Sequence, residues 1–326
     1  GVTPEKILKL YNAIGEVSKW FETLVGVLQG CVLSPLLFNV MLEVIMALAQ
    51  EEESGILVSG CRINNLRFAD DIAFLANEQQ ELQQQISQLH STSTRFGLRI
   101  STSKTEVQCI SRHPHALKIS VGGVELNHVE NFTYLGGVIS QDARCEQDIR
   151  RRINLATGIA SSLQTVWKER DISLRTKVRV YETMVLSVLL YNAETWTMKA
   201  ADESKIRAFE MSVLRRICGV SLRDKWRNDD IKALLGIEID VVERIQRRRL
   251  SYFGHVSRMK SDRVPLRMLN GRIHGNRPRG RPRRNWLDAV EEDCRERHIT
   301  LLQACRLTED RGQWQKMVSG PPRRST

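Results

Sequence analysis

The sequence predicts an α+β protein with a mixed N-terminal part and a helical remainder. Short alternating or apolar runs, separated by turn residues, favour strands within residues 1–140. From residue 141 onward, apolar residues recur every three and four positions, which is typical of amphipathic helices. We therefore expect a mixed region at 1–140, a helical region at 141–220 and a basic helical region at 221–326. The last contains a Gly, Pro and Arg-rich linker at 271–284.

Composition and cysteine content indicate a globular protein of a reducing compartment. The chain has 326 residues, 41% of them hydrophobic, which is enough for each region to bury a core. It contains no apolar run of eighteen residues, and its N-terminus lacks the basic start and cleavage site of a secretory signal. The seven cysteines are odd in number and never form a Cys-x-x-Cys pair. We expect an intracellular protein, nuclear or cytoplasmic and not secreted, with no membrane partner.

Charge is distributed unevenly along the chain. Residues 1–140 carry a net charge of −4 and residues 141–326 one of +15, for +11 overall. This asymmetry favours binding of nucleic acid or another polyanion, because basic side chains release counterions from phosphates. The alternative is that Arg and Lys residues solvate the faces of long helices.

The first predicted elements are a helix and two strands. Ser34 and Pro35 suit the cap and first position of a helix over residues 36–53. Strands are expected at 56–58 and 62–66. The apolar residues of the helix recur at three- and four-residue steps, and they are Leu37, Met41, Val44, Ile45 and Leu48.

Two adjacent acids, Asp70 and Asp71, interrupt the apolar run of residues 66–75. The run predicts a hairpin with the acids at its tip. Removing two neighbouring carboxylates from water costs several kcal/mol per ion unless cations offset it, and divalent metals do so best. The pair therefore indicates either a metal site or a solvated turn, in which Asp is favoured for its own side-chain hydrogen bonds.

Further short elements and then long helices follow the acidic pair. A polar helix is expected over residues 78–96, ended by Gly97, and residues 122–123 suit the turn of a hairpin. Short strands are expected at 107–110, 117–121, 124–126 and 132–139. Helices are expected at 149–167, 174–192, 202–218, 228–235, 240–259 and around 286–314.

Several motifs resemble, in order, those of one family. Gln29 and Gly30 precede the Ser-Pro helix entry, and the Phe-Ala-Asp-Asp sequence of residues 68–71 follows it. Later pieces come in the same order, namely Gly97–Ile100 with Lys104, Phe132–Gly137, Leu189–Tyr191 with Glu194–Trp196, and Phe253–His255. Together they resemble the reverse transcriptases of non-LTR (LINE-like) retrotransposons. The resemblance spans nearly the whole chain and implies a truncated fragment of such an enzyme.

The resemblance implies a partial polymerase palm, in which helices pack on an antiparallel sheet, followed by an all-helical thumb and a C-terminal helical segment. It also implies RNA-directed DNA synthesis by two-Mg²⁺ nucleotidyl transfer, with an RNA template, a DNA primer and dNTPs. Asp70 would bind both metal ions, and Asp71 would be the auxiliary acid. Lys104 would neutralise or protonate the leaving pyrophosphate, although a lone Lys is more often a solvated surface residue.

By the same resemblance, two further groups of residues would hold nucleotides and nucleic acid. Gln29 and Gly30 would face the nascent base pair. Phe68 would either pack against the palm helices or contact the nucleotide. By the resemblance, Tyr134, Leu135 and Gly136 would place the primer end. The alternative is that Tyr134 and Leu135 are core residues, as a Tyr and a Leu in a strand often are.

One residue of the family pattern is missing. A third metal-binding Asp lies upstream of the Gln-Gly turn in the family, and residues 1–21 contain no Asp. We expect the remaining pair to bind Mg²⁺ poorly, since this ion demands near-octahedral coordination. The sequence thus predicts an incomplete polymerase that is inactive by itself. The alternative is a catalytically inactive nucleic-acid-binding remnant.

Two basic clusters are candidates for nucleic-acid binding. The first lies on the helix at 240–259, on which Val241, Val242, Ile245 and Leu250 would face inward, and it comprises Arg244, Arg247, Arg248 and Arg249. The second places Gly280 between Arg279 and Arg281 and resembles the AT-hook, which lies in the minor groove. Its alternative is a flexible basic linker that binds phosphates. His255 has no cysteine pair at finger spacing, so we interpret it as a histidine at a helix end.

Overall fold

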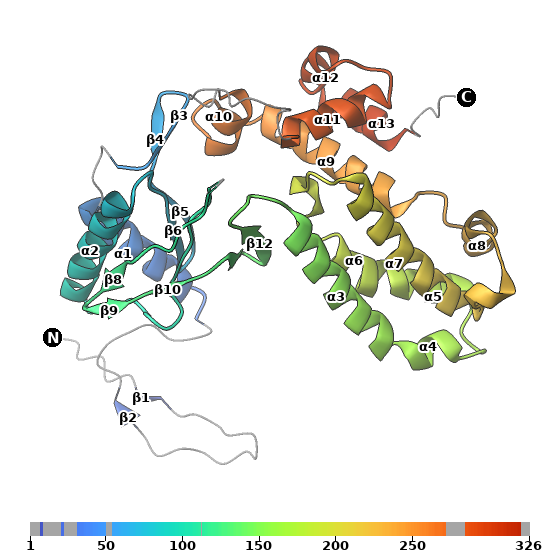
Figure 1. Cartoon of the computed structure of the whole chain (residues 1–326), viewed down its shortest axis with the longest axis horizontal. Coiled ribbons are helices and arrows are strands. Elements are labelled where there is room, and N and C mark those ends of the chain that lie inside the picture. Colours follow the sequence, from blue (N-terminus) through green and yellow to red (C-terminus); the bar gives the residue numbers. More distant parts are fainter. Residues whose placement is uncertain are drawn as a thin grey trace. The chain divides into compact units, whose positions relative to one another are not determined.

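The computed structural model describes residues 7–8, 21–22, 31–49, 54–111, 113–271 and 284–320. The chain divides into two compact units. Unit 1 comprises Gly1–Leu57, Arg62–Thr102 and Ile119–Glu125, and unit 2 comprises Val58–Cys61, Ser103–Lys118 and Leu126–Thr326. Helices and small two-stranded sheets occur together (Figure 1), so the predicted α+β class is confirmed. The region boundaries at residues 140 and 220 stay predictions.

The secondary structure of unit 1 consists of two helices and short antiparallel strand pairs. Helix α1 (Ser34–Ala49) packs against α2 (Gln79–Arg95), close to the predicted ranges. The strand pairs are β1 (Ile7–Leu8) with β2 (Phe21–Glu22), β5 (Asn65–Phe68) with β6 (Asp71–Phe74), and β8 (Ser120–Val121) with β9 (Val124–Glu125). Gly122 and Gly123 form the predicted turn between β8 and β9, both at positive φ. A further sheet pairs β3 (Ile56–Val58) with β4 (Cys61–Ile63).

The core of unit 1 lies between α1, α2 and the β5–β6 hairpin, and its buried residues are Leu42, Ile45, Met46, Ala49 and Leu89. Ile72 and Phe74 of β6 pack against this core. The predicted apolar stripe of α1 is wrong in part, since its members Leu37, Val44 and Leu48 are exposed. Residues 42, 45, 46 and 49 form a second stripe at three- and four-residue steps, and this second stripe is the buried one.

The strands of unit 2 form two small sheets. Strand β7 (Glu106–Val107) pairs in parallel with β10 (Asn127–His128). Strands β11 (Asn131–Tyr134) and β12 (Gly137–Ser140) form an antiparallel hairpin, with Tyr134 opposite Gly137 at the turn. The range predicted as strand at 132–139 is therefore a hairpin whose turn consists of residues 135–136.

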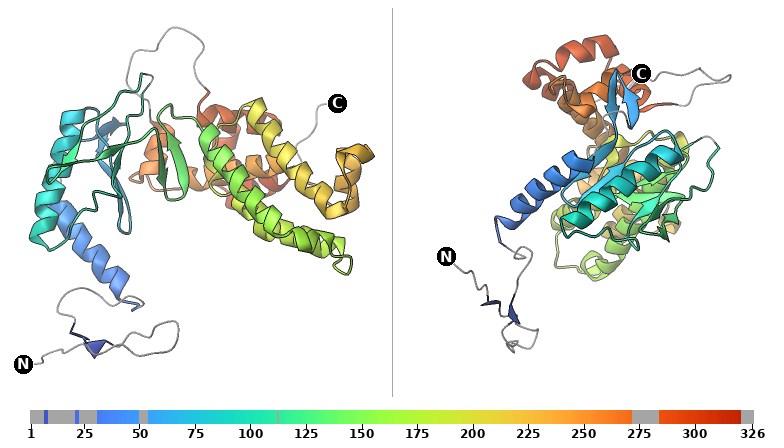
Figure 2. Two further views of the ribbon diagram at one scale, coloured as in Figure 1. Left: turned by 60° about the horizontal axis from the view of Figure 1, so that its bottom comes forward. Right: turned by 90° about the vertical axis from the view of Figure 1, so that its left-hand side faces the viewer.

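A helical bundle follows this hairpin in unit 2, and it contains α3 (Glu146–Ser162), α4 (Gln164–Lys168), α5 (Leu174–Val180), α6 (Ser187–Leu189), α7 (Ala200–Cys218) and α8 (Asn228–Leu235). Helices α3 and α7 lie side by side (Figure 2). A π-helical turn at Tyr181–Leu186 interrupts the helix predicted at 174–192. The large buried side chains of the bundle core include Trp167, Tyr181, Trp196 and Leu214.

The last part of unit 2 is also helical and contains α9 (Val241–Ser257), α10 (Val264–Asn270), α11 (Trp286–Arg295), α12 (Leu301–Leu307) and α13 (Arg311–Ser319). Helix α9 contributes to two cores. Its predicted inward positions are confirmed, with Val241, Val242 and Ile245 in the bundle core and Leu250 in a C-terminal core with α11 and α13. Within the described residues, no helix has the length and apolar character needed to cross a membrane.

Candidate active site

The two adjacent acids lie at the tip of the β5–β6 hairpin, as the sequence predicts. Phe68 and Asp71 are the last pair of the strand register, so Ala69 and Asp70 form a two-residue turn. Both acids are exposed to solvent. Ala69 has a φ of 52°, a left-handed conformation that is uncommon for a residue with a Cβ. The backbone is therefore strained directly beside the acids.

The β5–β6 hairpin is bound to α1 one residue pair below its tip. Arg67 of β5 forms an ion pair with Glu43 of α1, with 2.6 Å between Nη1 and Oε2. The side chains of β6 that face the core add apolar contacts. Phe68 exposes 63% of its surface, so the expectation that it packs against the helices is wrong. A contact between Phe68 and a nucleotide stays a prediction.

The chemistry of the acidic pair suits part of a metal site. Carboxylate oxygens are ligands that Mg²⁺ prefers. Among the residues that the structure describes, no group of three or more His, Cys, Asp or Glu side chains is placed to hold a metal ion. Asp70 and Asp71 therefore need further oxygen ligands, from phosphates or from another carboxylate, to complete the coordination that Mg²⁺ demands.

Other predicted site residues lie elsewhere. Gln29 and Gly30 are outside the described residues, as are Arg279 and Arg281 of the basic linker. Lys104 is exposed in a turn and belongs to unit 2, whereas the acidic pair belongs to unit 1. A common site for Lys104 and the acids therefore stays a prediction.

The turn of the β11–β12 hairpin is bound by three side chains of unit 2. Leu135 and Gly136 form this turn, with φ values of 47° and 80°. The Leu135 carbonyl accepts a hydrogen bond from the Tyr191 hydroxyl at 3.0 Å. The Gly136 carbonyl accepts hydrogen bonds from the guanidinium groups of Arg151, at 2.8 Å, and Arg152. These bonds fix the backbone of the turn while Leu135 stays 40% exposed.

A buried carboxylate connects the same hairpin to the helical bundle. Asp148 of α3 accepts hydrogen bonds from the Val138 amide at 3.0 Å and from the Trp196 indole at 2.7 Å. Arg152 lies one turn further along α3, with its Nε 3.9 Å from the Asp148 carboxylate, and its guanidinium is 4.3 Å from the centre of the Tyr191 ring. Burial lowers the pKa of Arg152, and the charge of Asp148 opposes that shift. We refer to Asp148, Arg151, Arg152 and Tyr191 as the hairpin-binding residues.

Sequence reasoning did not assign a role to any of the hairpin-binding residues. Tyr191 entered only as part of a motif. One local signal was present, since Asp148 and Arg152 have the i,i+4 spacing of a helical ion pair and Asp148 adjoins the apolar stripe at Ile149. This signal indicates a buried ion pair, but it does not indicate that a hairpin turn is the third partner.

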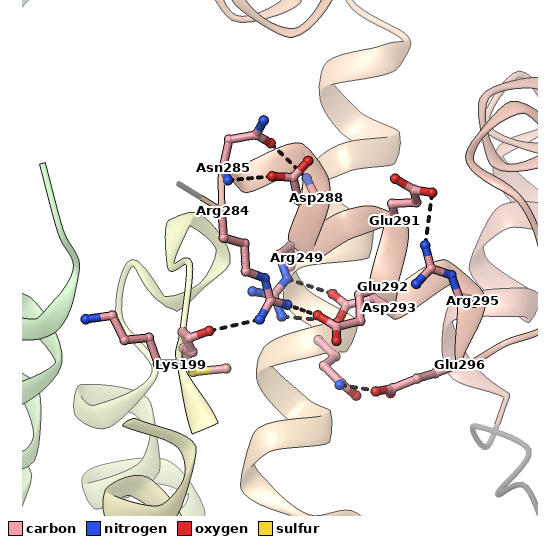
Figure 3. Close-up of polar contacts among 12 residues, drawn as sticks. Lys199, Arg249, Arg284, Asn285, Asp288, Glu291, Glu292, Asp293, Arg295 and Glu296 are labelled. Carbon is pink, nitrogen blue, oxygen red and sulfur yellow. Dashed lines mark hydrogen bonds and ion pairs between the residues drawn. The ribbon is translucent and has the colours of Figure 1, made fainter. Parts of the chain in front are cut away.

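Arg249 of α9 is part of the interior rather than of a surface. Its side chain is 3% exposed and binds Asp293 of α11 through hydrogen bonds of 2.6 and 3.2 Å (Figure 3). A third bond of 2.6 Å goes to the Trp196 carbonyl. Arg284 donates in the same area to the Met198 carbonyl at 3.1 Å. Arg249 thus links the two helical cores of unit 2, and we exclude it from any proposed nucleic-acid interface.

The three other arginines of the predicted cluster on α9 differ in their partners and in their exposure. Arg244 pairs with Glu182 at 2.7 Å, and Arg247 pairs with Glu243 at 2.8 Å. Arg248 donates to the Leu190 carbonyl at 2.6 Å and lies 3.9 Å from the Glu194 carboxylate, and its side chain stays 47% exposed. All three arginines thus have a carboxylate partner, and Arg248 is the most exposed of them.

Comparisons with known proteins agree on one family. Residues 2–139 match the family model described as reverse transcriptase (RNA-dependent DNA polymerase). An uncharacterized transposon-derived protein of Caenorhabditis elegans is 28% identical over 274 residues, which cover 80% of this chain and 97% of that protein. The retrovirus-related Pol polyprotein from the type-1 retrotransposable element R2 of Nasonia vitripennis is 30% identical over 149 residues. That match covers 42% of this chain and 14% of the polyprotein.

These matches support a reverse transcriptase fragment of a non-LTR retrotransposon. The family-model match ends at residue 139, within β12. Both the acidic hairpin and the turn of the β11–β12 hairpin lie inside the match. The hairpin-binding residues lie beyond it. The matched segment is only 14% of the retrotransposon Pol relative, which is therefore much longer than this chain.

The Phe-Gly-His motif of residues 253–255 has a packing explanation. A Cβ on Gly254 would overlap the indole ring of Trp314 in α13. That indole donates a hydrogen bond to the Leu250 carbonyl of α9 at 3.1 Å. Glycine therefore permits the close approach of α9 and α13. His255, the last residue of the motif, is exposed at the C-terminal end of α9.

Proposed function

We propose that this chain is the part of a non-LTR retrotransposon polymerase that performs RNA-directed DNA synthesis, with residues 1–140 as a partial palm, 141–220 as a helical thumb and 221–326 as a basic C-terminal region. The observation that carries the proposal is the exposed Asp70–Asp71 pair at a hairpin tip, within the range that matches the reverse transcriptase model. An exposed tip leaves the carboxylates accessible to metal-bound nucleotide.

In the proposed site, Asp70 and Asp71 would hold Mg²⁺. When bound, the metal ions would lower the charge on the reacting phosphates. Lys104 neutralises the leaving pyrophosphate, as Lys residues do at developing negative charge. The exposed ring of Phe68 contacts the nucleotide.

The β11–β12 hairpin places the end of the DNA primer in this proposal. Tyr134, Leu135 and Gly136 lie at or beside its turn, and Leu135 is partly exposed there. The three hydrogen bonds to the turn carbonyls hold this backbone in one position. Positioning of reactants is a large part of nucleotidyl-transfer catalysis, because small displacements at the reacting atoms lower the rate strongly.

The described residues supply two carboxylates to the proposed site, fewer than a two-metal site uses. We propose that the pair by itself binds Mg²⁺ weakly and that the isolated chain has low activity or none. The same observation supports a second candidate function. In that alternative the chain is a catalytically inactive nucleic-acid-binding remnant, and its basic part, residues 141–326 with a net charge of +15, carries the binding.

Primer extension on an RNA template with Mg²⁺ tests both candidates. Asp70→Asn preserves size and removes the charge, so any extension by the wild-type chain should fall at least a hundredfold. Asp262→Asn, at another exposed turn, is the matched control and should keep wild-type activity. Extension by the wild-type chain that Asp70→Asn does not lower would overturn the polymerase proposal. Salt-sensitive binding of template-primer without extension would favour the second candidate.

A further inference from the structure

A basic groove lies between α9 and α13 in the C-terminal part of unit 2. It has a volume of about 680 Å³, and its lining includes the four arginines Arg247, Arg248, Arg258 and Arg311 together with His255. Ser251, Gln315 and Ser319 add polar groups to the walls. The lining contains no acidic side chain. Two of the four arginines pair with carboxylates outside the lining, Arg247 with Glu243 and Arg248 with Glu194, so the other two give the groove its excess of positive charge.

The two walls of the groove are regular helical faces. On α9 the residues 247, 248, 251, 255 and 258 recur at the spacing that places side chains on one face. On α13 the residues 311, 315 and 319 do the same. Trp314 is buried at the base, where its indole bonds to α9, so no exposed aromatic ring is offered for stacking with a base. The groove therefore offers charge and hydrogen-bond donors rather than a base-reading surface.

Two of the four arginines of the groove have no carboxylate partner. Arg258 donates to the Thr308 carbonyl at 2.9 Å, which is a neutral acceptor. The Arg311 side chain is exposed and forms no hydrogen bond or ion pair with the part of the chain that the structure describes. Arg247 and Arg248 are paired, with Glu243 at 2.8 Å and with Glu194 at 3.9 Å. Arg258 and Arg311 therefore carry the positive charges that remain to bind phosphates.

The groove continues along α9 into a second hollow. This hollow has a volume of about 400 Å³ and shares Arg247 and Arg248 with the basic groove. Arg247 and Arg258, the C-cap residue of α9, are eleven residues apart, which corresponds to about 16 Å along the helix axis. Counted along the axis of a duplex, where each strand has one phosphate per 3.4 Å, a length of about 16 Å spans roughly five phosphates of one strand.

We propose that the groove between α9 and α13 binds the sugar–phosphate backbone of a nucleic acid strand without reading its sequence. Arginine binds phosphate oxygens with two parallel hydrogen bonds, and the serine and glutamine side chains are neutral donors to the same groups. This site differs from the predicted cluster on α9, since it excludes the buried Arg249 and adds Arg258 and Arg311. It does not depend on the polymerase proposal, because it requires neither metal nor the acidic pair.

The test measures binding of a fluorescein-labelled 20-nucleotide RNA, and of DNA with the same sequence, by anisotropy in EDTA over a range of salt concentrations. Without Mg²⁺ the acidic pair contributes nothing, so the result is separate from catalysis. The variant Arg258→Gln/Arg311→Gln removes two of the proposed contacts. It should reduce the slope of log affinity against log salt by about 1.4, since each phosphate contact on a single strand contributes about 0.7. Binding should weaken severalfold for RNA and DNA alike.

Two matched variants make the result decisive. Arg175→Gln/Arg223→Gln removes the same charge from exposed sites outside the groove and should keep the wild-type slope. Arg258→Lys/Arg311→Lys keeps the positive charge and should also keep the wild-type slope. A wild-type slope for Arg258→Gln/Arg311→Gln would overturn the proposal, as would an equal loss in the Arg175 and Arg223 control. If Arg258→Gln/Arg311→Gln weakened the binding of RNA alone or of DNA alone, phosphate would be overturned as the recognised group, because both strands carry it.

Discussion

Two hairpins of similar form, β5–β6 and β11–β12, differ in how their turns are held. Each has two four-residue strands and a two-residue turn. In each, the first turn residue is a non-glycine at positive φ, Ala69 at 52° and Leu135 at 47°. Within the described residues, no side chain donates a hydrogen bond to the β5–β6 turn, whereas three side chains donate to the carbonyls of the β11–β12 turn.

This difference in hydrogen bonding indicates that the two hairpin turns are suited to different roles. The β5–β6 tip presents exposed carboxylates, and the ion pair that binds this hairpin to α1, between Arg67 and Glu43, lies one residue pair below the tip. Side chains at such a tip are available to a ligand. The β11–β12 turn instead directs its backbone carbonyls into a network of charged and aromatic side chains. A turn bound in this way is suited to hold a position rather than to supply reactive groups.

The largest expected effect comes from removing the buried acid beneath the β11–β12 hairpin. Asp148→Ala leaves the Val138 amide and the Trp196 indole without their acceptor, and it leaves Arg152 without its nearest counter-charge. Breaking a buried charged network in this way should lower the free energy of unfolding by about 3–5 kcal/mol. Tryptophan fluorescence during urea unfolding measures this change in unit 2, which contains five of the six tryptophans. Asp171→Ala, at an exposed loop, should change stability by about 0.5 kcal/mol or less. A similar loss in both variants would contradict the role given to Asp148.

The second expected effect concerns the glycine of the same turn. Gly136→Ala places a Cβ at a φ of 80°, 3.3 Å from the Tyr191 ring and 3.4 Å from the Arg152 guanidinium. Backbone strain alone costs about 1–2 kcal/mol for a residue with a Cβ in this conformation. Thermal unfolding should show a loss of at least this size. Gly123→Ala is the control for strain without crowding, since no atom lies within 4 Å of its added Cβ. If both substitutions cost the same, the contacts with Tyr191 and Arg152 do not constrain the turn.

The long helices could be predicted from the sequence within a few residues. Helix α2 was expected at 78–96 and spans Gln79–Arg95, and α9 was expected at 240–259 and spans Val241–Ser257. Apolar spacing and end residues are local signals, and they suffice for such elements. In α1 almost every residue is apolar, so two stripes were possible. Which stripe is buried depends on the packing of α2, which is not a local property.

The candidate site was predictable where its geometry is local. The acidic tip of β5–β6 follows from a strand pattern and a two-residue turn. The burial of Arg249 does not, because its partner Asp293 lies 44 residues away in the chain. The exposure of Phe68 was also missed, since strand alternation alone does not show whether one face of a short hairpin near its tip is covered.

A smaller effect is expected from the tyrosine that binds the turn. Tyr191→Phe removes the hydroxyl that donates to the Leu135 carbonyl at 3.0 Å and keeps the ring beside Arg152. Because the side chain is 49% exposed, water can replace part of this bond, and the loss should be about 0.5–1.5 kcal/mol. Fluorescence-monitored unfolding measures it. In the Asp148→Ala background the loss should shrink if the two residues act on one network. Full additivity in the double variant would indicate that they act independently.

The smallest expected effect has the opposite sign and tests the two turns against each other. Ala69→Gly relieves the positive φ of the β5–β6 turn and removes only an exposed methyl group, so unit 1 should gain up to about 1 kcal/mol. Leu135→Gly relieves the same kind of strain. However, Leu135 is only 40% exposed, so this substitution also removes the packing contacts of its buried part. We therefore expect no gain, or a loss, in unit 2. Hydrogen exchange of the peptides that contain β5–β6 and β11–β12 measures both changes. A gain of equal size in both hairpins would contradict this comparison. It would show that packing and hydrogen bonding stabilise the β11–β12 turn no more than they stabilise the acidic tip. The two hairpins would then differ in backbone conformation alone.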